Sequence, residues 1–187
     1  HGRSNDVHIV NFGGEFSVNA LVEGAHTEEA GRDHSKRAIR ENDVPDIMTR
    51  EEYADKMEAL VAAANIPAHL DPVPPVVCKW IFDTIRSANG LGIFAHPNWI
   101  SDVYQVPEAL TDYMFETRPF DAFEVLGGES YYEHNGTQTA RYYEECAKGH
   151  KVPIVGSTDS HCSYSSNRNA FICSTMACRL LRKMHYL

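Results

Sequence analysis

The sequence lacks the cysteine pattern of a disulfide-stapled or zinc-knuckle protein. It contains five cysteines, an odd number, and none of them has CxxC spacing. Such usage argues against a disulfide framework and against a structural zinc site, and it favours a reducing compartment such as the cytoplasm. Because the chain begins with His1 rather than Met, an upstream signal is not excluded, and secretion stays open.

An excess of positive charge and long apolar runs are also missing. Lys and Arg number 17 against 26 Asp and Glu, which gives a formal charge of −9. We therefore expect no extended surface for nucleic acid, which would need many cations. No run approaches the roughly 18 apolar residues of a membrane span. What is present, 187 residues with 43% hydrophobic content, suffices for one domain over residues 1–187.

Short apolar strands and amphipathic helices alternate along the chain. The expected strands are 7–12, 91–95, 121–126 and 151–155, and the expected helices are 49–61, 71–88, 106–115 and 132–148. This alternation predicts parallel strands joined by helical crossovers, either as an open α/β sheet or as a β/α barrel. The polar segment of about 15–46 is expected to be an excursion, and 176–187 is an atypical basic and apolar tail.

Local signals mark the ends of the predicted helices. Thr49 and Glu52 have the spacing of a capping box, and Asp71-Pro72 combines a side-chain cap with a first-turn proline. Asn89-Gly90 predicts a left-handed stop. The second helix is expected to bury one stripe, which consists of Val77, Trp80, Ile81, Thr84 and Ile85.

Four residues with metal-binding chemistry lie in or near the predicted strands. His8 is in the first strand, His96 ends the second, and Asp159 and His161 follow the last. In parallel α/β folds the residues beyond the carboxyl ends of strands gather at one face. Imidazole and carboxylate together suit Zn, Mn or Fe. Glu124, in the third strand, is a candidate general base or a hydrogen-bond acceptor that ties the interior together.

Three segments that contain these residues resemble one family. Gly92–Pro97 (GIFAHP), Asp121–Val125 (DAFEV) and Val155–His161 (VGSTDSH) are similar to motifs of the PHP (polymerase and histidinol phosphatase) family, and Val7–Val10 resembles its second-motif histidine. The resemblance implies a distorted seven-stranded (β/α) barrel that hydrolyses phosphoesters with up to three divalent metal ions.

The resemblance also implies roles for individual residues. His8 and His96 would bind one ion, while Asp159 and His161 would bind a second and a third ion and belong to the catalytic centre. The family's first motif, His-x-His, and a bridging glutamate do not occur in this sequence. We therefore expect the chain to be a fragment of the barrel, incomplete at its N-terminus, with partial metal occupancy and an exposed sheet edge.

The implied substrate is a small phosphorylated compound or a nucleotide. Arg168 is a candidate phosphate clamp, and Asn98 and His134 are candidates to contact substrate. Two other functions stay open. The chain could be a non-catalytic, degenerate PHP-like module that serves structure or interaction, or a related metal-dependent barrel of the amidohydrolase type. The sequence indicates nothing about oligomeric state.

Overall fold

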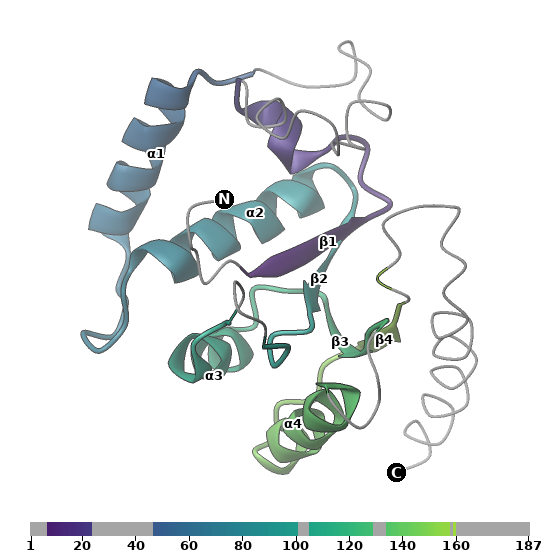
Figure 1. Cartoon of the computed structure of the whole chain (residues 1–187). Coiled ribbons are helices and arrows are strands. Elements are labelled where there is room, and N and C mark those ends of the chain that lie inside the picture. Colours follow the sequence, from purple (N-terminus) through teal and green to yellow (C-terminus); the bar gives the residue numbers. More distant parts are fainter. Residues whose placement is uncertain (1–6, 24–46, 101–104, 129–133, 158, 160–187) are drawn as a thin grey trace. The chain divides into compact units, whose positions relative to one another are not determined.

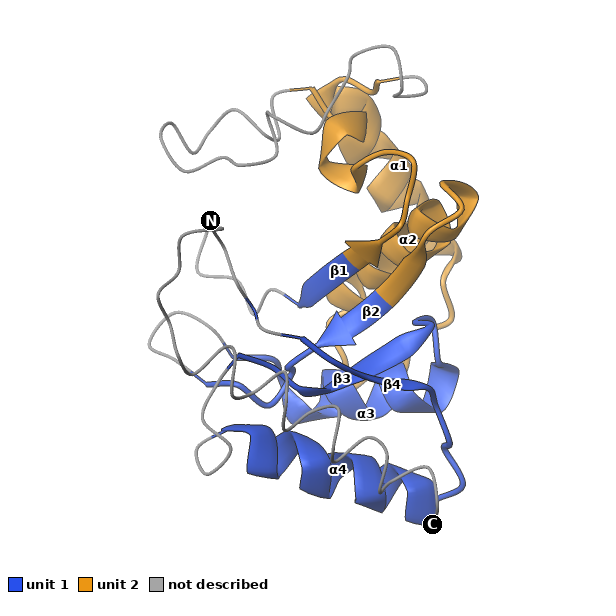
Figure 2. Cartoon of the chain, turned by 90° about the vertical axis from the view of Figure 1, so that its right-hand side faces the viewer, with its two compact units in different colours: residues 1–10, 93–187 blue, residues 11–92 orange. Residues whose placement is uncertain are grey.

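The computed structural model describes residues 7–23, 47–100, 105–128, 134–157 and 159 (Figure 1). Most of the predicted polar excursion and the whole tail, 176–187, lie outside these residues. The chain divides into two compact units, residues 1–10 with 93–187 and residues 11–92 (Figure 2). The interpretation of 1–187 as one domain stays a prediction.

The unit of residues 11–92 contains two helices whose ends match the local signals. α1 (Arg50–Ala63) begins with the predicted capping box, because Thr49 Oγ1 accepts from the Glu52 amide at 3.2 Å and Glu52 Oε2 accepts from the Thr49 amide at 2.8 Å. The carboxylate of Asp71 accepts from the Val73 amide at 3.0 Å where α2 begins, but the N-cap position is Pro72, one residue later than predicted. α2 (Val73–Ser87) stops before Asn89, whose φ of 58° is left-handed as predicted. A short 3-10 helix, η1 (Val18–Leu21), precedes α1.

The buried face of α2 differs from the predicted stripe. Ile85 is buried, but the other four predicted positions are only half-buried. The fully buried side chains are Pro75, Val76, Cys78, Phe82 and Ile85. Apolar residues occur on most sides of α2, so the period of the apolar residues does not determine which face of the helix is buried. Trp80 instead packs on Tyr53 of α1, with ring centroids 5.4 Å apart.

The strands form a four-stranded sheet in the order β1-β2-β3-β4. Their bounds are His8–Phe12 (β1), Leu91–Ala95 (β2), Ala122–Leu126 (β3) and Ile154–Gly156 (β4). β2 pairs with β3 in parallel, and β3 pairs with β4 in parallel. α3 (Glu108–Thr117) and α4 (Gly136–Ala147) lie in the connections between these strands. The predicted parallel crossovers are therefore confirmed for three of the four strands.

β1 runs antiparallel to β2, so the prediction of an all-parallel arrangement is wrong at this strand. His8, which begins β1, lies beside His96, which follows β2. Gly14, just after β1, lies close to Gly90, just before β2. A Cβ added to Gly90 would lie 2.9 Å from the Cα of Gly14. A single helical crossover returns the chain to the sheet edge from which the first strand began, which makes the two strands parallel. The described residues between β1 and β2 instead contain two α-helices, α1 and α2, and a second helix reverses the chain once more, as an antiparallel β2 requires.

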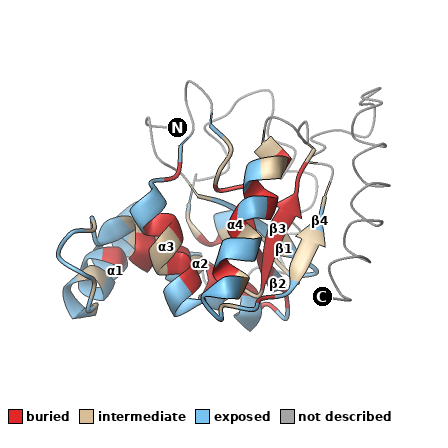
Figure 3. Cartoon of the chain, turned by 90° about the horizontal axis from the view of Figure 1, so that it is seen from below, coloured by how far each residue is buried: buried red, intermediate tan, exposed pale blue. Residues whose placement is uncertain are grey.

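The core of the unit that contains β3 is aromatic. Phe94, Phe115, Phe120 and Phe123 pack together with ring centroids 5.1 to 6.2 Å apart. Every residue of β3 is buried (Figure 3), whereas Val10 and Phe12 on β1 are 41% and 65% exposed. A strand with both faces covered is typical of the middle of a parallel sheet. The described residues form an open sheet, and the seven-stranded barrel stays a prediction.

α4 buries a polar face. Glu145 is 1% exposed and lies 2.8 Å from both Arg141 and Lys148, and 2.7 Å from His150 Nδ1. Arg141 also pairs with Asp112 of α3. Burial acts to raise the pKa of Glu145, but hydrogen bonds from Lys148 and His150 and the charge of Arg141 outweigh it, so the pKa lies below its usual value. His150 is half-buried against Glu145.

Candidate functional site

His96 follows β2 directly and has a strained backbone. Its φ is 27°, in the left-handed region that a histidine rarely adopts. Its carbonyl accepts a hydrogen bond from the Trp99 amide at 3.0 Å, which closes a turn through Pro97. The turn points the chain away from the sheet and leaves the imidazole 8% exposed. Strained residues of this kind concentrate at functional sites.

A buried carboxylate holds the imidazole of His96. Glu124, in the middle of β3, is 1% exposed, and its Oε2 lies 2.5 Å from His96 Nδ1. Its other oxygen accepts a hydrogen bond from the Ser157 hydroxyl, just after β4. An ionised carboxylate only accepts, so the proton of a neutral His96 lies on Nδ1 and the lone pair on Nε2. Of the two roles expected for Glu124, this arrangement fits the hydrogen-bond acceptor.

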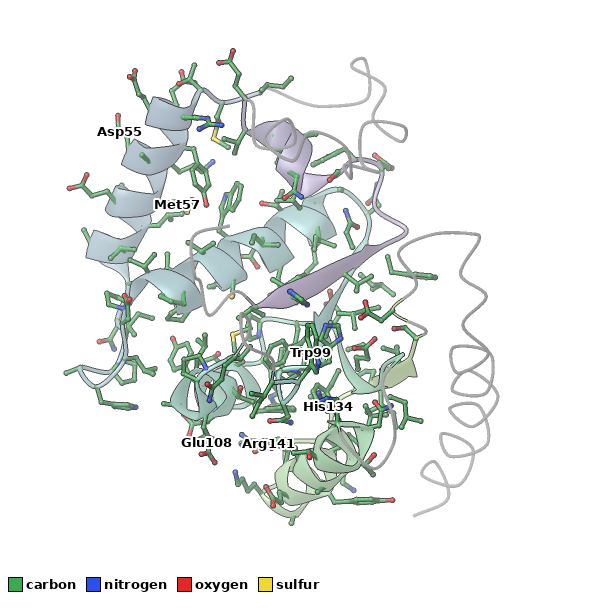
Figure 4. All side chains as sticks on the ribbon, viewed as in Figure 1. Asp55, Met57, Trp99, Glu108, His134 and Arg141 are labelled. Atoms are coloured by element: carbon green, nitrogen blue, oxygen red, sulfur yellow. The ribbon has the colours of Figure 1, made fainter. Side chains whose placement is uncertain are left out.

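His8 meets the other nitrogen of His96. The distance from His8 Nδ1 to His96 Nε2 is 2.8 Å, and the two rings are nearly perpendicular, with an interplanar angle of 85°. The ring of Trp99 lies 6.0 Å from His8 and 5.8 Å from His96 (Figure 4). Ser157, Glu124, His96 and His8 thus form one hydrogen-bonded chain, with an indole beside both imidazoles.

Gly127 lies beside this chain, with room for about one methyl group between them. A Cβ added there would lie 3.4 Å from Glu124 Oε2 and 3.8 Å from His96 Nδ1. The side chain of Asn135 holds the same residue through two hydrogen bonds, 2.7 Å from the Gly127 amide and 3.2 Å to its carbonyl oxygen. Asn135 is 1% exposed. The residues that begin α4 therefore reach the end of β3.

The His8 and His96 nitrogens could together serve one metal ion. Two imidazole ligands on a tetrahedral zinc, at about 2.0–2.1 Å each, stand about 3.3 Å apart. The observed 2.8 Å needs an opening of about half an ångström to match this. The carboxylate on Nδ1 of His96 is also the usual outer partner of a metal-bound histidine. These residues fit two ligands. Among the residues that the structure describes, however, no group of three or more His, Cys, Asp or Glu could hold an ion.

The other predicted site residues divide into two groups. Asp159 is described, half-buried and left-handed with φ 45°, but it does not complete a three-residue metal group with His8 and His96. His161 and Arg168 lie outside the described residues. Asn98 donates to the buried Gln138 side chain at 3.0 Å. His134 is half-buried, one residue before Asn135 in the turn that leads into α4 (Figure 4).

Three residues of the site were missed by the sequence reasoning. Ser157 lies inside the Gly-Ser-Thr-Asp-Ser-His stretch, whose Asp and His drew attention first. Asn135 and Gln138 belong to a helix whose buried side chains are polar, so a search for apolar periodicity passes over them. The one available signal was the Asn135-Gly136 pair, placed where a helix should start.

Comparisons with known proteins did not find a relative. The chain matches no protein-family model, no curated protein and no solved structure. Within the described part of the chain, none of the helices has the length and apolar character needed to cross a membrane.

Proposed function

We propose that this chain supplies the paired imidazole ligands of a metal-dependent phosphoesterase that acts on a small phosphorylated substrate or a nucleotide. The observation that supports this most is the convergence of His8 Nδ1 and His96 Nε2, 2.8 Å apart, with Glu124 behind His96. The resemblance of the segments around His96 and Asp159 to the PHP family agrees with this chemistry. In this proposal the fold is part of a distorted seven-stranded β/α barrel.

His8 and His96 would hold the ion, which is Zn, Mn or Fe by the chemistry of the donors. Such an ion supplies Lewis acidity and lowers the pKa of a bound water toward neutrality. Glu124 keeps the proton of His96 on Nδ1, and therefore keeps a lone pair on Nε2 for the ligand role. Ser157 fixes the second oxygen of Glu124, and the indole of Trp99 lies beside both rings. Asp159, His161 and Arg168 stay candidates for further ions and for the substrate phosphate.

The test is metal binding by the 187-residue chain, followed by a substrate panel. Zn²⁺ and Mn²⁺ titrations should show a site that His8→Ala and His96→Ala each abolish. His69→Ala is a matched control, because His69 is exposed and lies in the unit of residues 11–92. The metal-loaded chain should hydrolyse aryl phosphate mono- or diesters, with less activity on aryl acetate. If no titration distinguishes the wild type from His96→Ala, the proposal is wrong.

A second candidate function is a degenerate, non-catalytic PHP-like module. The observation that favours it is the direct His8 to His96 hydrogen bond, in which each ring already satisfies the other. The same titrations separate the two functions, because a module of this kind retains its fold and binds no ion at these histidines. Cleavage of aryl acetate or an amide without phosphoester cleavage would instead support an amidohydrolase-type barrel.

A further inference from the structure

We propose that Asn135 is a positioning residue for the His96–Glu124 pair, and that it acts through the backbone of Gly127. This inference deepens the proposed function and rests on it for its metal-binding consequence. Its consequence for the imidazole of His96 does not depend on any metal. The positioning role of Asn135 and the proposed metal-binding function can therefore be tested separately.

The geometry links α4 to the imidazole through Gly127. Asn135 donates to the carbonyl oxygen of Gly127 and accepts from its amide, so both backbone polar groups of this residue are held by one side chain. Gly127 in turn lies beside the Glu124 oxygen and the His96 nitrogen that are bonded to each other, since a Cβ added to it would lie 3.4 Å and 3.8 Å from these two atoms. A rotation of the Gly127 backbone would therefore change the space around this hydrogen bond.

The side chain of Asn135 is held by Gly127 rather than by its own helix. The backbone of Asn135 is itself helical, with φ −66° and ψ −29°, and its side chain makes no capping hydrogen bond to α4. The side chain is also 1% exposed, so its two bonds to Gly127 replace hydration that it has lost.

A second contact from the same turn supports this function of α4. Gln138, three residues on and fully buried, accepts a hydrogen bond from Asn98, which lies two residues after His96. The first turn of α4 thus holds both the residues after β2 and the residues after β3. His96 and Glu124 come from these same two strands.

The experiment compares Asn135→Ala with a control in the same helix. Thr139→Val removes the hydroxyl that donates to the Asn135 carbonyl at 2.8 Å, which perturbs α4 but not Gly127. The readout is the imidazole Nδ1–H signal of His96 in proton NMR of the full chain, assigned by its absence in His96→Gln. A hydrogen bond to a buried carboxylate should make this proton strongly deshielded and slow to exchange. We expect Asn135→Ala to lose the signal and Thr139→Val to keep it.

Gly127→Ala provides a test that leaves α4 intact. The added methyl fits, at 3.4 Å from the nearest Glu124 oxygen, so this variant should fold even if Asn135→Ala does not. It should shift the same His96 proton. If the signal is unchanged in Gly127→Ala, or unchanged in a folded Asn135→Ala, Asn135 does not position His96 and the inference is overturned.

The metal-binding consequence uses the same variants. Loss of an outer partner of a metal ligand typically lowers affinity by about 10- to 100-fold, and we expect Asn135→Ala to fall in this range for Zn²⁺ while Thr139→Val does not. If the wild-type chain binds no Zn²⁺ but Asn135→Ala loses the His96 proton, the proposed function fails and the positioning role stands.

Discussion

α2 and α4 are helices of similar length that bury opposite kinds of side chain. The buried side chains of α2 are all apolar, with Phe82 at 0% exposure and Ile85 at 1%. Those of α4 are all polar or charged: Gln138, Thr139, Arg141 and Glu145. Apolar burial is non-directional and stabilises almost any close packing, whereas polar burial costs free energy for each group that does not find a partner.

The difference indicates what each helix does. α2 stabilises its unit by removing apolar surface from water, at roughly 25 cal/mol per Å². The buried side chains at the start of α4 instead form hydrogen bonds to particular atoms, including the Gly127 backbone and the Asn98 side chain. In the described structure Gln138 Nε2 and Arg141 Nε are left without a partner. We infer that α2 is built for stability and α4 for placing residues at the strand ends.

The largest expected change in unfolding free energy comes from removing apolar burial on α2. Phe82→Ala should destabilise the chain by about 3–5 kcal/mol, because it leaves a cavity under a fully buried ring. Urea unfolding monitored by circular dichroism measures this loss. Ile81→Ala, at the half-buried neighbouring position, should cost clearly less. Equal losses would mean that the burial of α2 does not determine stability.

Glu145→Gln should weaken the charged cluster of α4, with a loss of about 1.5–3 kcal/mol, since it removes one of the two carboxylates, Glu145 and Asp112, that pair with the buried Arg141. The neighbouring Glu144 is exposed, so Glu144→Gln is the matched control and should have little effect.

The lowered pKa of Glu145 also predicts a pH dependence. The carboxylate stabilises the fold fully above its usual pKa, about 4 to 5, and this stabilisation is lost as pH falls through the lowered value of the folded state. Urea unfolding between pH 7 and pH 3 should show a shallower acid slope in Glu145→Gln than in the wild type. An identical slope would contradict the pairing of Glu145 with its cations.

A smaller effect concerns the strained residue that α4 helps to place. His96→Gly and His96→Ala both remove the imidazole, so their difference isolates the backbone at φ 27°. The glycine variant should be more stable by about 1 kcal/mol, because only glycine adopts this region freely. Thermal unfolding of both proteins measures the difference. Ala62→Gly, at an exposed position inside α1, should show the opposite sign.

The smallest expected effect concerns the side-chain amide nitrogen of Gln138, which is buried without a hydrogen-bond partner among the described residues. Gln138→Met keeps the volume, removes the unsatisfied Nε2 and loses the bond to Asn98, which is half-buried and can bind water instead. The expected change in unfolding free energy is within about 1 kcal/mol in either direction. A loss as large as that of Phe82→Ala would show that Gln138 stabilises the fold rather than positioning Asn98.

Much of the fold could be predicted from short-range patterns. The capping box at Thr49, the left-handed stop at Asn89 and the four strands depend on neighbouring residues alone, and the structure contains them. The direction of β1 could not be predicted this way, because it depends on two intervening helices. The buried face of α2 was also misassigned, since apolar residues lie on most sides of that helix.

The candidate site was predicted only in part, for a related reason. His8 and His96 could be named because they lie in or at the end of predicted strands and because the motifs resemble a known family. Their direct contact could not, since it joins residues 88 positions apart in the sequence. Asn135 escaped prediction because its partner is a backbone peptide, and a glycine gives no side-chain pattern that could pair with it.

The left-handed conformation of His96 has a consequence for how this sequence would change over generations. At φ 27° every residue with a side chain is held against its backbone preference, and glycine or asparagine would relieve the strain. In a descendant that no longer uses the imidazole, substitution at position 96 should therefore drift toward glycine or asparagine. The residue found at this position in related chains is thus a readout of the proposed role of His96.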